Sequence, residues 1–129
     1  MEKTLREIAK GEITKWRILP KESIDKEKYS EIFKGFIILM EDPETTEYAV
    51  PEESVMLEGI MPVNEDSGYA TCTSYLRNAK KEDGVFYVET KSGSIYSFRK
   101  EKMDWLMKMA CVEITQYGTI EMSLPKPRF

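Results

Sequence analysis

Carboxylate side chains are concentrated in one stretch of the 129-residue chain. Residues 41–66 contain nine acidic side chains and no basic one, whereas residues 1–34 carry a net charge of +2 and residues 77–129 a net charge of +3. A concentrated negative field attracts a basic partner and speeds its association. The sequence therefore predicts a docking surface for a protein with a basic surface, and the predicted contact residues are Glu41, Asp42, Glu44, Glu47, Glu52, Glu53 and Glu58.

The same carboxylates fit two other interpretations. Acidic residues along an exposed sheet edge keep that edge from pairing with another chain, and this protective role is the simplest reading. A divalent metal site is the other, but neither Asp42–Thr45 nor Asn64–Gly68 has the ligand spacing of a calcium loop. We predict no metal site here, and the negative charge excludes direct nucleic-acid binding by this stretch.

Arginine and tyrosine side chains in the second half of the chain form another candidate site. Guanidinium groups pair with phosphates and carboxylates, and both guanidinium groups and aromatic rings stack on nucleobases. The alternative prediction is therefore a pocket for a nucleotide or another small anionic ligand. Its residues would be Arg77, Tyr87, Tyr96 and Arg99.

The usual catalytic residues are missing. The chain has no histidine, the side chain that most often transfers protons near neutral pH, and it has no phosphate-binding glycine loop, G-x-S-x-G or H-E-x-x-H motif. Ser92, beside Gly93, is typical of a hairpin turn. Cys72 and Cys111 lie outside any C-x-x-C pair, which predicts two buried free thiols. We expect a binding protein without a cofactor, and not an enzyme.

Helical patterns dominate the first third of the chain. Apolar residues in Thr4–Leu19 recur at three- and four-residue steps, which predicts a helix. Gly11 leaves open the alternative that residues 13–19 are extended. A second, short helix is predicted to begin after an N-cap at Ser23 and to end at Gly35.

From residue 36 the pattern changes to short β-branched and aromatic runs separated by turn residues. Phe36–Glu41 and Thr46–Val50 flank Pro43 and predict a hairpin. Residues 52–62 fit neither period cleanly and favour a strand over a helix. A meander of three antiparallel strands is predicted next, over Tyr69–Asn78, Val85–Thr90 and Ser94–Arg99, with Gly84 and Gly93 in its turns.

The end of the chain predicts one or two helical turns within residues 100–107 and a last hairpin. Met109–Tyr117 and Thr119–Leu124 would form this hairpin around Gly118, and the proline-containing tail at 125–129 is expected to fray.

One α+β domain over residues 1–129 is therefore expected, helix-weighted to residue 35 and β-rich from 36 to 124. We predict a helical N-terminal third packed on a curved, mostly antiparallel sheet, with closure into a small, partly open barrel as an alternative. The longest apolar run, Phe36–Met40, is too short to cross a membrane, and the charged N-terminus does not resemble a secretory signal. A cytoplasmic location without membrane contact is expected.

The stretch Thr73–Phe98 contains the pattern V-x-T-x-S-G-S-x-Y, from Val88 to Tyr96. This strand–turn–strand pattern resembles one in small β-rich accessory proteins of phages and other mobile elements, without indicating one specific family. The resemblance implies a protein that acts by binding, as an inhibitor or as a ligand sponge.

The sequence as a whole leaves three hypotheses for the function. The protein could bind a basic protein, bind a small anion, or form a homo-oligomer with adaptable methionines at its interface.

Overall fold

The computed structural model describes residues 3–128 and has the predicted α+β class. In chain order the elements are α1 (Leu5–Ile8), β1 (Thr14–Pro20), α2 (Lys26–Glu41), β2 (Glu47–Ala49), β3 (Val55–Pro62), β4 (Gly68–Cys72), β5 (Leu76–Glu82), β6 (Val85–Thr90), β7 (Ile95–Phe98), the 3-10 helix η1 (Lys100–Lys102) and α3 (Trp105–Tyr117). Two antiparallel sheets have the strand orders β1-β3-β4 and β2-β5-β6-β7. Both sheets are open, so the barrel that the sequence left as an alternative does not form.

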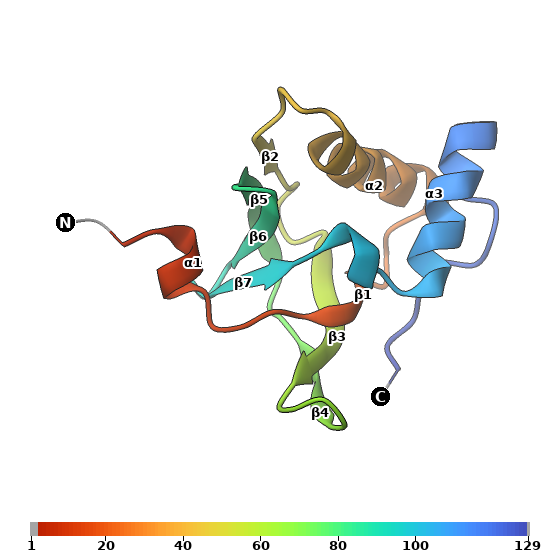
Figure 1. Cartoon of the computed structure of the whole chain (residues 1–129). Helices are drawn as coiled ribbons and strands as arrows, with labels where there is room; N and C mark the ends of the chain where they lie inside the picture. Colours follow the sequence, from red (N-terminus) through yellow and green to blue (C-terminus); the bar gives the residue numbers. More distant parts are fainter. Residues whose placement is uncertain (1–2, 129) are drawn as a thin grey trace.

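The segment before β1 joins the two sheets. The backbone N–H of Ser97 in β7 donates to Gly11 O at 2.9 Å, and that of Ile13 donates to Ser97 O at 2.8 Å. The chain then enters β1 and pairs with β3. Figure 1 shows the result: α2 and α3 lie near each other, and α1 lies away from them, beside β7.

The core lies where α2 and α3 meet the sheets. Its largest side chains are aromatic, and Trp16, Phe33, Phe36 and Phe98 are fully buried. Trp16 contacts Phe98 edge to face, with 5.0 Å between ring centroids. Burial of such rings contributes most to the stability of a small core.

The meander is confirmed by β5, β6 and β7, in which β6 pairs on both sides. Asp83 and Gly84 have φ values of 52° and 77°, and this left-handed pair forms the tight turn expected between β5 and β6. The predicted strand 69–78 is instead two strands in different sheets. The side-chain hydroxyl of Thr73 accepts from Leu57 N and donates to Ser74 O, and these bonds hold the chain where it leaves β4.

The first predicted helix ends at Ile8, and the extended alternative for residues 13–19 is confirmed by β1. Helix α2 differs more from its prediction. Its N-cap is Asp25, whose carboxylate accepts from Lys28 N at 2.7 Å, and not Ser23. The helix continues through Gly35 to Glu41, so the predicted hairpin of Phe36–Glu41 with Thr46–Val50 is wrong. An apolar run of this length fits a buried helix as well as a strand.

The predicted C-terminal hairpin is also wrong. Residues 105–117 form α3, and Gly118 has a φ of 78° because it caps this helix in the left-handed conformation. Residues 125–128 do not fray: Pro125 is buried, and Arg128 forms ion pairs with Glu58 and Asp104. Phe129 lies outside the described residues.

The two cysteines are not both buried. Cys72 is exposed on β4, and Cys111 is half-buried on α3, so the prediction of two buried thiols is wrong. Partial desolvation of the sulfur and a nearby acidic residue raise the pKa of each thiol, with Glu58 acting on Cys72 and Glu41 on Cys111. Both therefore favour the protonated form.

Candidate functional site

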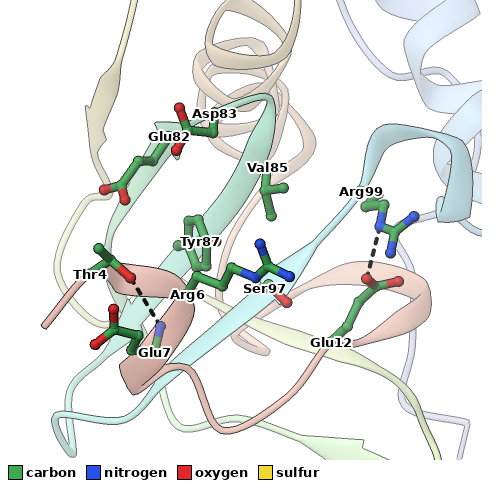
Figure 2. A pocket seen from close by; sticks show the side chains of 10 residues that line it. All are labelled: Thr4, Arg6, Glu7, Glu12, Glu82, Asp83, Val85, Tyr87, Ser97 and Arg99. Atoms are coloured by element: carbon green, nitrogen blue, oxygen red, sulfur yellow. Dashed lines mark hydrogen bonds and ion pairs between the residues drawn. The ribbon is translucent and has the colours of Figure 1, made fainter.

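A cavity of about 950 Å³ lies between α1, the β5–β6 turn and β7. We call it the α1 pocket. Figure 2 shows the side chains that line it, contributed by segments far apart in the chain: Thr4, Arg6, Glu7, Glu12, Glu82, Asp83, Val85, Tyr87, Ser97 and Arg99. The size suits a small ligand or one long side chain of a partner.

Local structure explains how α1 brings its charges to the pocket. The Thr4 hydroxyl accepts from Glu7 N at 3.3 Å, which caps this single helical turn. The backbone N–H of Lys10 donates to Ile95 O at 2.8 Å, which fixes the end of α1 beside β7. Arg6 and Glu7 are thereby held over the outer face of the sheet, as Figure 2 shows.

The opposite wall comes from the β5–β6 hairpin and β7. The tight turn presents Glu82 and Asp83 at one end of the pocket. Tyr87 is paired with Ser97 in the sheet, and both side chains line the pocket because directly opposed residues point to the same face. Tyr87 is 5% exposed, so its ring forms part of the pocket floor.

The pocket has an excess of negative charge. It contains four carboxylates and two guanidinium groups, and the Arg99 Nε lies 2.9 Å from Glu12 Oε1. Arg99 and Glu12 therefore largely neutralise each other. Of the remaining charged side chains in the pocket, one is positive, Arg6, and three are negative, Glu7, Glu82 and Asp83. None of these three carboxylates forms an ion pair within residues 3–128.

The charges in the pocket affect the pKa of Tyr87. Burial raises the pKa of its phenol, Glu82 and Asp83 raise it further, and Arg6 acts in the opposite direction. The phenol is therefore uncharged at neutral pH, and its hydroxyl can donate or accept a hydrogen bond. An aromatic ring among carboxylates is also a favourable neighbour for a cation.

The structure brings together only two of the four residues of the predicted anion site. Tyr87 and Arg99 line the α1 pocket, whereas Arg77 lines a separate cavity of about 440 Å³ with Tyr75 and Lys91. Tyr96 packs against the hydrophobic core, on the opposite face of β7 from Ser97. Four residues on three different surfaces do not make one pocket.

Other pocket residues were not identified from the sequence. The Asp-Gly pair indicated the turn at Asp83, but nothing indicated that Glu82, Arg6 and Glu7 would face the same space. Helix α1 is only four residues long and has no buried side chain. Its place beside β7 is set by backbone hydrogen bonds, which have no signature in the sequence.

Most predicted contact residues of the acidic stretch are exposed but separated. Asp42, Glu44 and Glu47 lie around the α2–β2 connection, and Glu52 and Glu53 follow the other end of β2. Three of the exposed acids already have partners. Glu41 pairs with Lys100, Glu53 pairs with Lys91, and Asp42 accepts from the Thr45 hydroxyl and from Glu44 N. These bonds lower the pKa of Asp42, and Lys91 lowers that of Glu53.

Glu58 is not part of that surface. It is 3% exposed, and its Oε1 lies 3.3 Å from Arg128 Nε while its Oε2 accepts from Arg128 N. The prediction that Glu58 contacts a partner is therefore corrected: its side chain points to the face of β3 covered by the C-terminal residues. Strand alternation at Leu57 and Glu58 sends one side chain to the core and the other to this salt bridge.

Comparisons with protein-family models, curated proteins and solved structures find no match to the chain. The site must be interpreted from its own chemistry. In the described part of the chain, no three His, Cys, Asp or Glu side chains gather into a group that could hold a metal ion. None of the helices found between residues 3 and 128 is both long and apolar enough to cross a membrane.

Proposed function

We propose that the protein is a non-enzymatic binding protein that engages a basic segment of a partner protein, with the α1 pocket receiving a lysine or arginine side chain of that segment. The observation that supports this most is the carboxylate excess around Tyr87. A role as an inhibitor in a phage or another mobile element belongs to the proposal only through the resemblance of Thr73–Phe98.

The charges in the α1 pocket favour a cationic guest over an anionic one. A cation would contact Glu7, Glu82 and Asp83, and it would lie over the ring of Tyr87. Arg99 is already paired with Glu12, so a nucleotide would meet one arginine without an ion pair, Arg6, and it would be repelled by the three other carboxylates. Glu7 and Asp83 are exposed to solvent, so each such charge pair contributes about 1 kcal/mol or less, and it is the sum over the carboxylates that favours a cation.

The acidic residues around β2 have a supporting role in this proposal. Glu44, Glu47 and Glu52 are exposed and form no ion pair within the described residues. Their field would steer a basic partner toward the protein without contacting the side chain in the pocket. Their effect should therefore be on the association rate, and it should weaken as salt is added.

Titration followed by ¹H–¹⁵N NMR tests the proposal, with an acetylated oligolysine peptide and ATP as separate probes. We expect the peptide to shift the amides of Arg6, Glu82, Tyr87 and Ser97 in a saturable way, and ATP to leave them unchanged. Saturable shifts with ATP at these amides, and none with the peptide, would show that the site binds anions instead.

A pair of double variants identifies the contact surface. Glu82→Gln with Asp83→Asn removes two charges from the pocket, and Asn retains the left-handed turn conformation. The control, Glu44→Gln with Glu47→Gln, removes the same charge from the β2 region. We expect the pocket variant to weaken peptide binding by about tenfold and the control by much less. Equal losses would mean that the peptide responds to overall charge, which contradicts a pocket.

A further inference from the structure

The two open sheets have four edge strands, and three of the edges are protected. Strand β7 is covered by the Gly11–Ile13 backbone, which bonds to Ser97. Strand β1 is covered by the chain after η1: Asp104 N donates to Trp16 O at 3.0 Å. Strand β2 is uncovered, but it has three residues and lies among the carboxylates of the acidic stretch. Charge and short length both prevent an edge from pairing with another chain.

Strand β4 has none of these protections. Residues 67–76 contain no charged side chain, in a chain of which 33% of the residues are charged. Gly68, Tyr69, Ala70 and Cys72 are exposed. Figure 1 shows the β3–β4 hairpin extending away from α2 and α3, and within residues 3–128 no turn, loop or inter-element backbone hydrogen bond reaches Gly68, Ala70 or Cys72. An uncharged, uncovered edge is a template for another strand.

Two hydrogen bonds define which β4 groups face outward. Thr73 N donates to Leu57 O, and Val63 N donates to Ser67 O, each at 2.9 Å. In an antiparallel ladder, bonded pairs alternate with non-bonded pairs. The register places Thr71 and Tyr69 in bonded pairs with β3. The backbone N–H and C=O groups of Gly68, Ala70 and Cys72 consequently point away from β3.

We propose that β4 pairs antiparallel with β4 of a second copy of this chain, about a two-fold axis at Ala70. In this register Ala70 faces Ala70 of the second copy, and Gly68 faces Cys72. All three outward-pointing residues then meet outward-pointing residues, and each facing pair exchanges two hydrogen bonds. In a register shifted by one residue, the outward-pointing backbone groups of one copy would face residues of the other copy whose groups point toward β3. The alternation of bonded and non-bonded pairs therefore excludes such registers.

A second copy fits this edge for two reasons. Self-pairing of β4 brings no like charges together. Self-pairing of β2 would instead bring Glu47 close to the carboxylates around β2 of the second copy. Tyr69 and Thr71 would also become cross-strand neighbours in a non-bonded pair, where side chains approach closely, and Tyr69 is now 55% exposed. Because only the five residues of β4 in each copy take part, the contact is below the size of a permanent interface, and the association is reversible.

Sedimentation velocity and amide hydrogen exchange over a wide concentration range, up to millimolar, test the proposal. We expect the sedimentation coefficient to rise with concentration. The amides of Ala70 and Cys72 should gain protection in parallel, while those of Tyr69 and Thr71, bonded to β3, stay protected throughout. A protein that sediments as a monomer at every concentration, with unchanged exchange at Ala70 and Cys72, overturns the proposal.

The variant Ala70→Pro deletes an outward N–H and leaves the β3 ladder intact. Its matched control is Ala49→Pro, because the bonds of Lys81 N to Thr46 O and of Val50 N to Arg77 O place Ala49 N–H at the open side of β2. We expect Ala70→Pro to raise the dimer dissociation constant by about tenfold and Ala49→Pro to leave it unchanged.

A second variant, Ala70→Lys, guards against misfolding of the proline variant. Ala70 is exposed, so a lysine is accommodated in the monomer, but it places two like charges at the two-fold axis. We expect a monomer with an unchanged circular dichroism spectrum. Association that persists in Ala70→Lys would overturn the proposal and point to another surface, such as the exposed face of α3 at Trp105.

Discussion

Tyr29 places an ionisable phenol inside the core. Its side chain is fully buried, and its hydroxyl donates to Ile18 O at 2.6 Å, which ties α2 to β1. Burial raises the pKa of this phenol far above the ordinary value of 10.0. Tyr48 follows the same trend, since burial and Glu31 raise its pKa to about 12. Both phenols therefore stay protonated in the folded state at pH values where a tyrosine of the unfolded chain begins to ionise.

These two tyrosines predict a loss of stability in alkali. Above about pH 10 the unfolded chain releases the phenolic protons and the folded protein keeps them, so the unfolded state binds fewer protons and the free energy of unfolding falls as the pH rises. Below pH 10 both states hold these protons, and the contribution is constant. Urea unfolding at pH 8, 10 and 11 measures the slope. In Tyr29→Phe the slope above pH 10 should be smaller; an unchanged slope would mean that Tyr29 ionises normally.

Arg128 belongs to a small ion-pair network with Glu58, Asp104 and Arg17. Its Nη2 lies 2.7 Å from Asp104 Oδ1, and Arg17 Nε lies 3.2 Å from Asp104 Oδ2. Glu58 is the most deeply buried member, with its side chain 4% exposed. The net charge of these two arginines and two acids is zero, which makes burial of the carboxylates tolerable.

Removing Arg128 should destabilise the fold through Glu58. In Arg128→Ala the Glu58 carboxylate stays buried without its partner, and we expect a loss of about 3 kcal/mol in the free energy of unfolding. Adding Glu58→Gln to that variant should restore much of the loss, since the uncompensated charge is gone. Chemical denaturation measures both variants, with Lys126→Ala as an exposed control. Equal stability of the single and double variants would contradict this explanation.

At the scale of elements, Gly35 lies inside α2, although the sequence predicted that the helix would end there. Its role is to allow close packing against Tyr48. A Cβ atom at this position would lie 2.2 Å from the ring of Tyr48 on β2. The Tyr48 ring also contacts Phe36 edge to face, with centroids 5.2 Å apart. Glycine lets the helix backbone approach the edge strand, and this packing offsets the helix propensity lost at Gly35.

Gly35→Ala should therefore destabilise the protein, although alanine is the better helix former. We expect the clash to cost about 1–3 kcal/mol, which exceeds the gain of about 1 kcal/mol from propensity. In a Tyr48→Ala background the clash is absent, and the same substitution should be stabilising. Urea unfolding of the four proteins forms a double-mutant cycle. A destabilisation that persists without Tyr48 would show that the ring is not the obstacle.

Sequence patterns predicted the elements whose determinants are local. The turns at Asp83-Gly84 and at Gly93 require positive φ, which their residue types supply, and the meander follows from them. Residues 36–41 of α2 and residues 109–117 of α3 were predicted as strands, since β-branched and aromatic residues suit either state. Their helical form is decided by burial against distant strands.

The site shows the same division. Tyr87 and Arg99 line the same pocket because β6 pairs with β7 and Arg99 directly follows β7. The carboxylates that decide the sign of the α1 pocket arrive partly from α1, which is placed by the bond of Lys10 N to Ile95 O. No spacing in the sequence encodes that bond. The predicted anion site therefore lacked the residues that favour a cation.

At the scale of the whole molecule, the two proposed surfaces belong to different sheets. The α1 pocket lies on the sheet containing β6 and β7, and the open edge belongs to β4 in the other sheet. The two proposed interactions would therefore use separate surfaces. A dimer formed through β4 would carry two α1 pockets, and a partner with two basic segments would bind it more tightly than it binds one copy.

The covered edge of β1 has a consequence for the order of folding. Trp16 Nε1 donates to Arg99 O, 83 positions later in the chain, and Asp104 follows on the same edge. During synthesis β1, with Trp16 and Ile18, is made early, but the residues that cover its edge, Arg99 and Asp104, are made much later. The hairpins of β5, β6 and β7 can form as soon as these strands have been synthesised. Closing this long loop should be the slow step, and chains that stop before Asp104 should keep the apolar side chains of β1 accessible to chaperones.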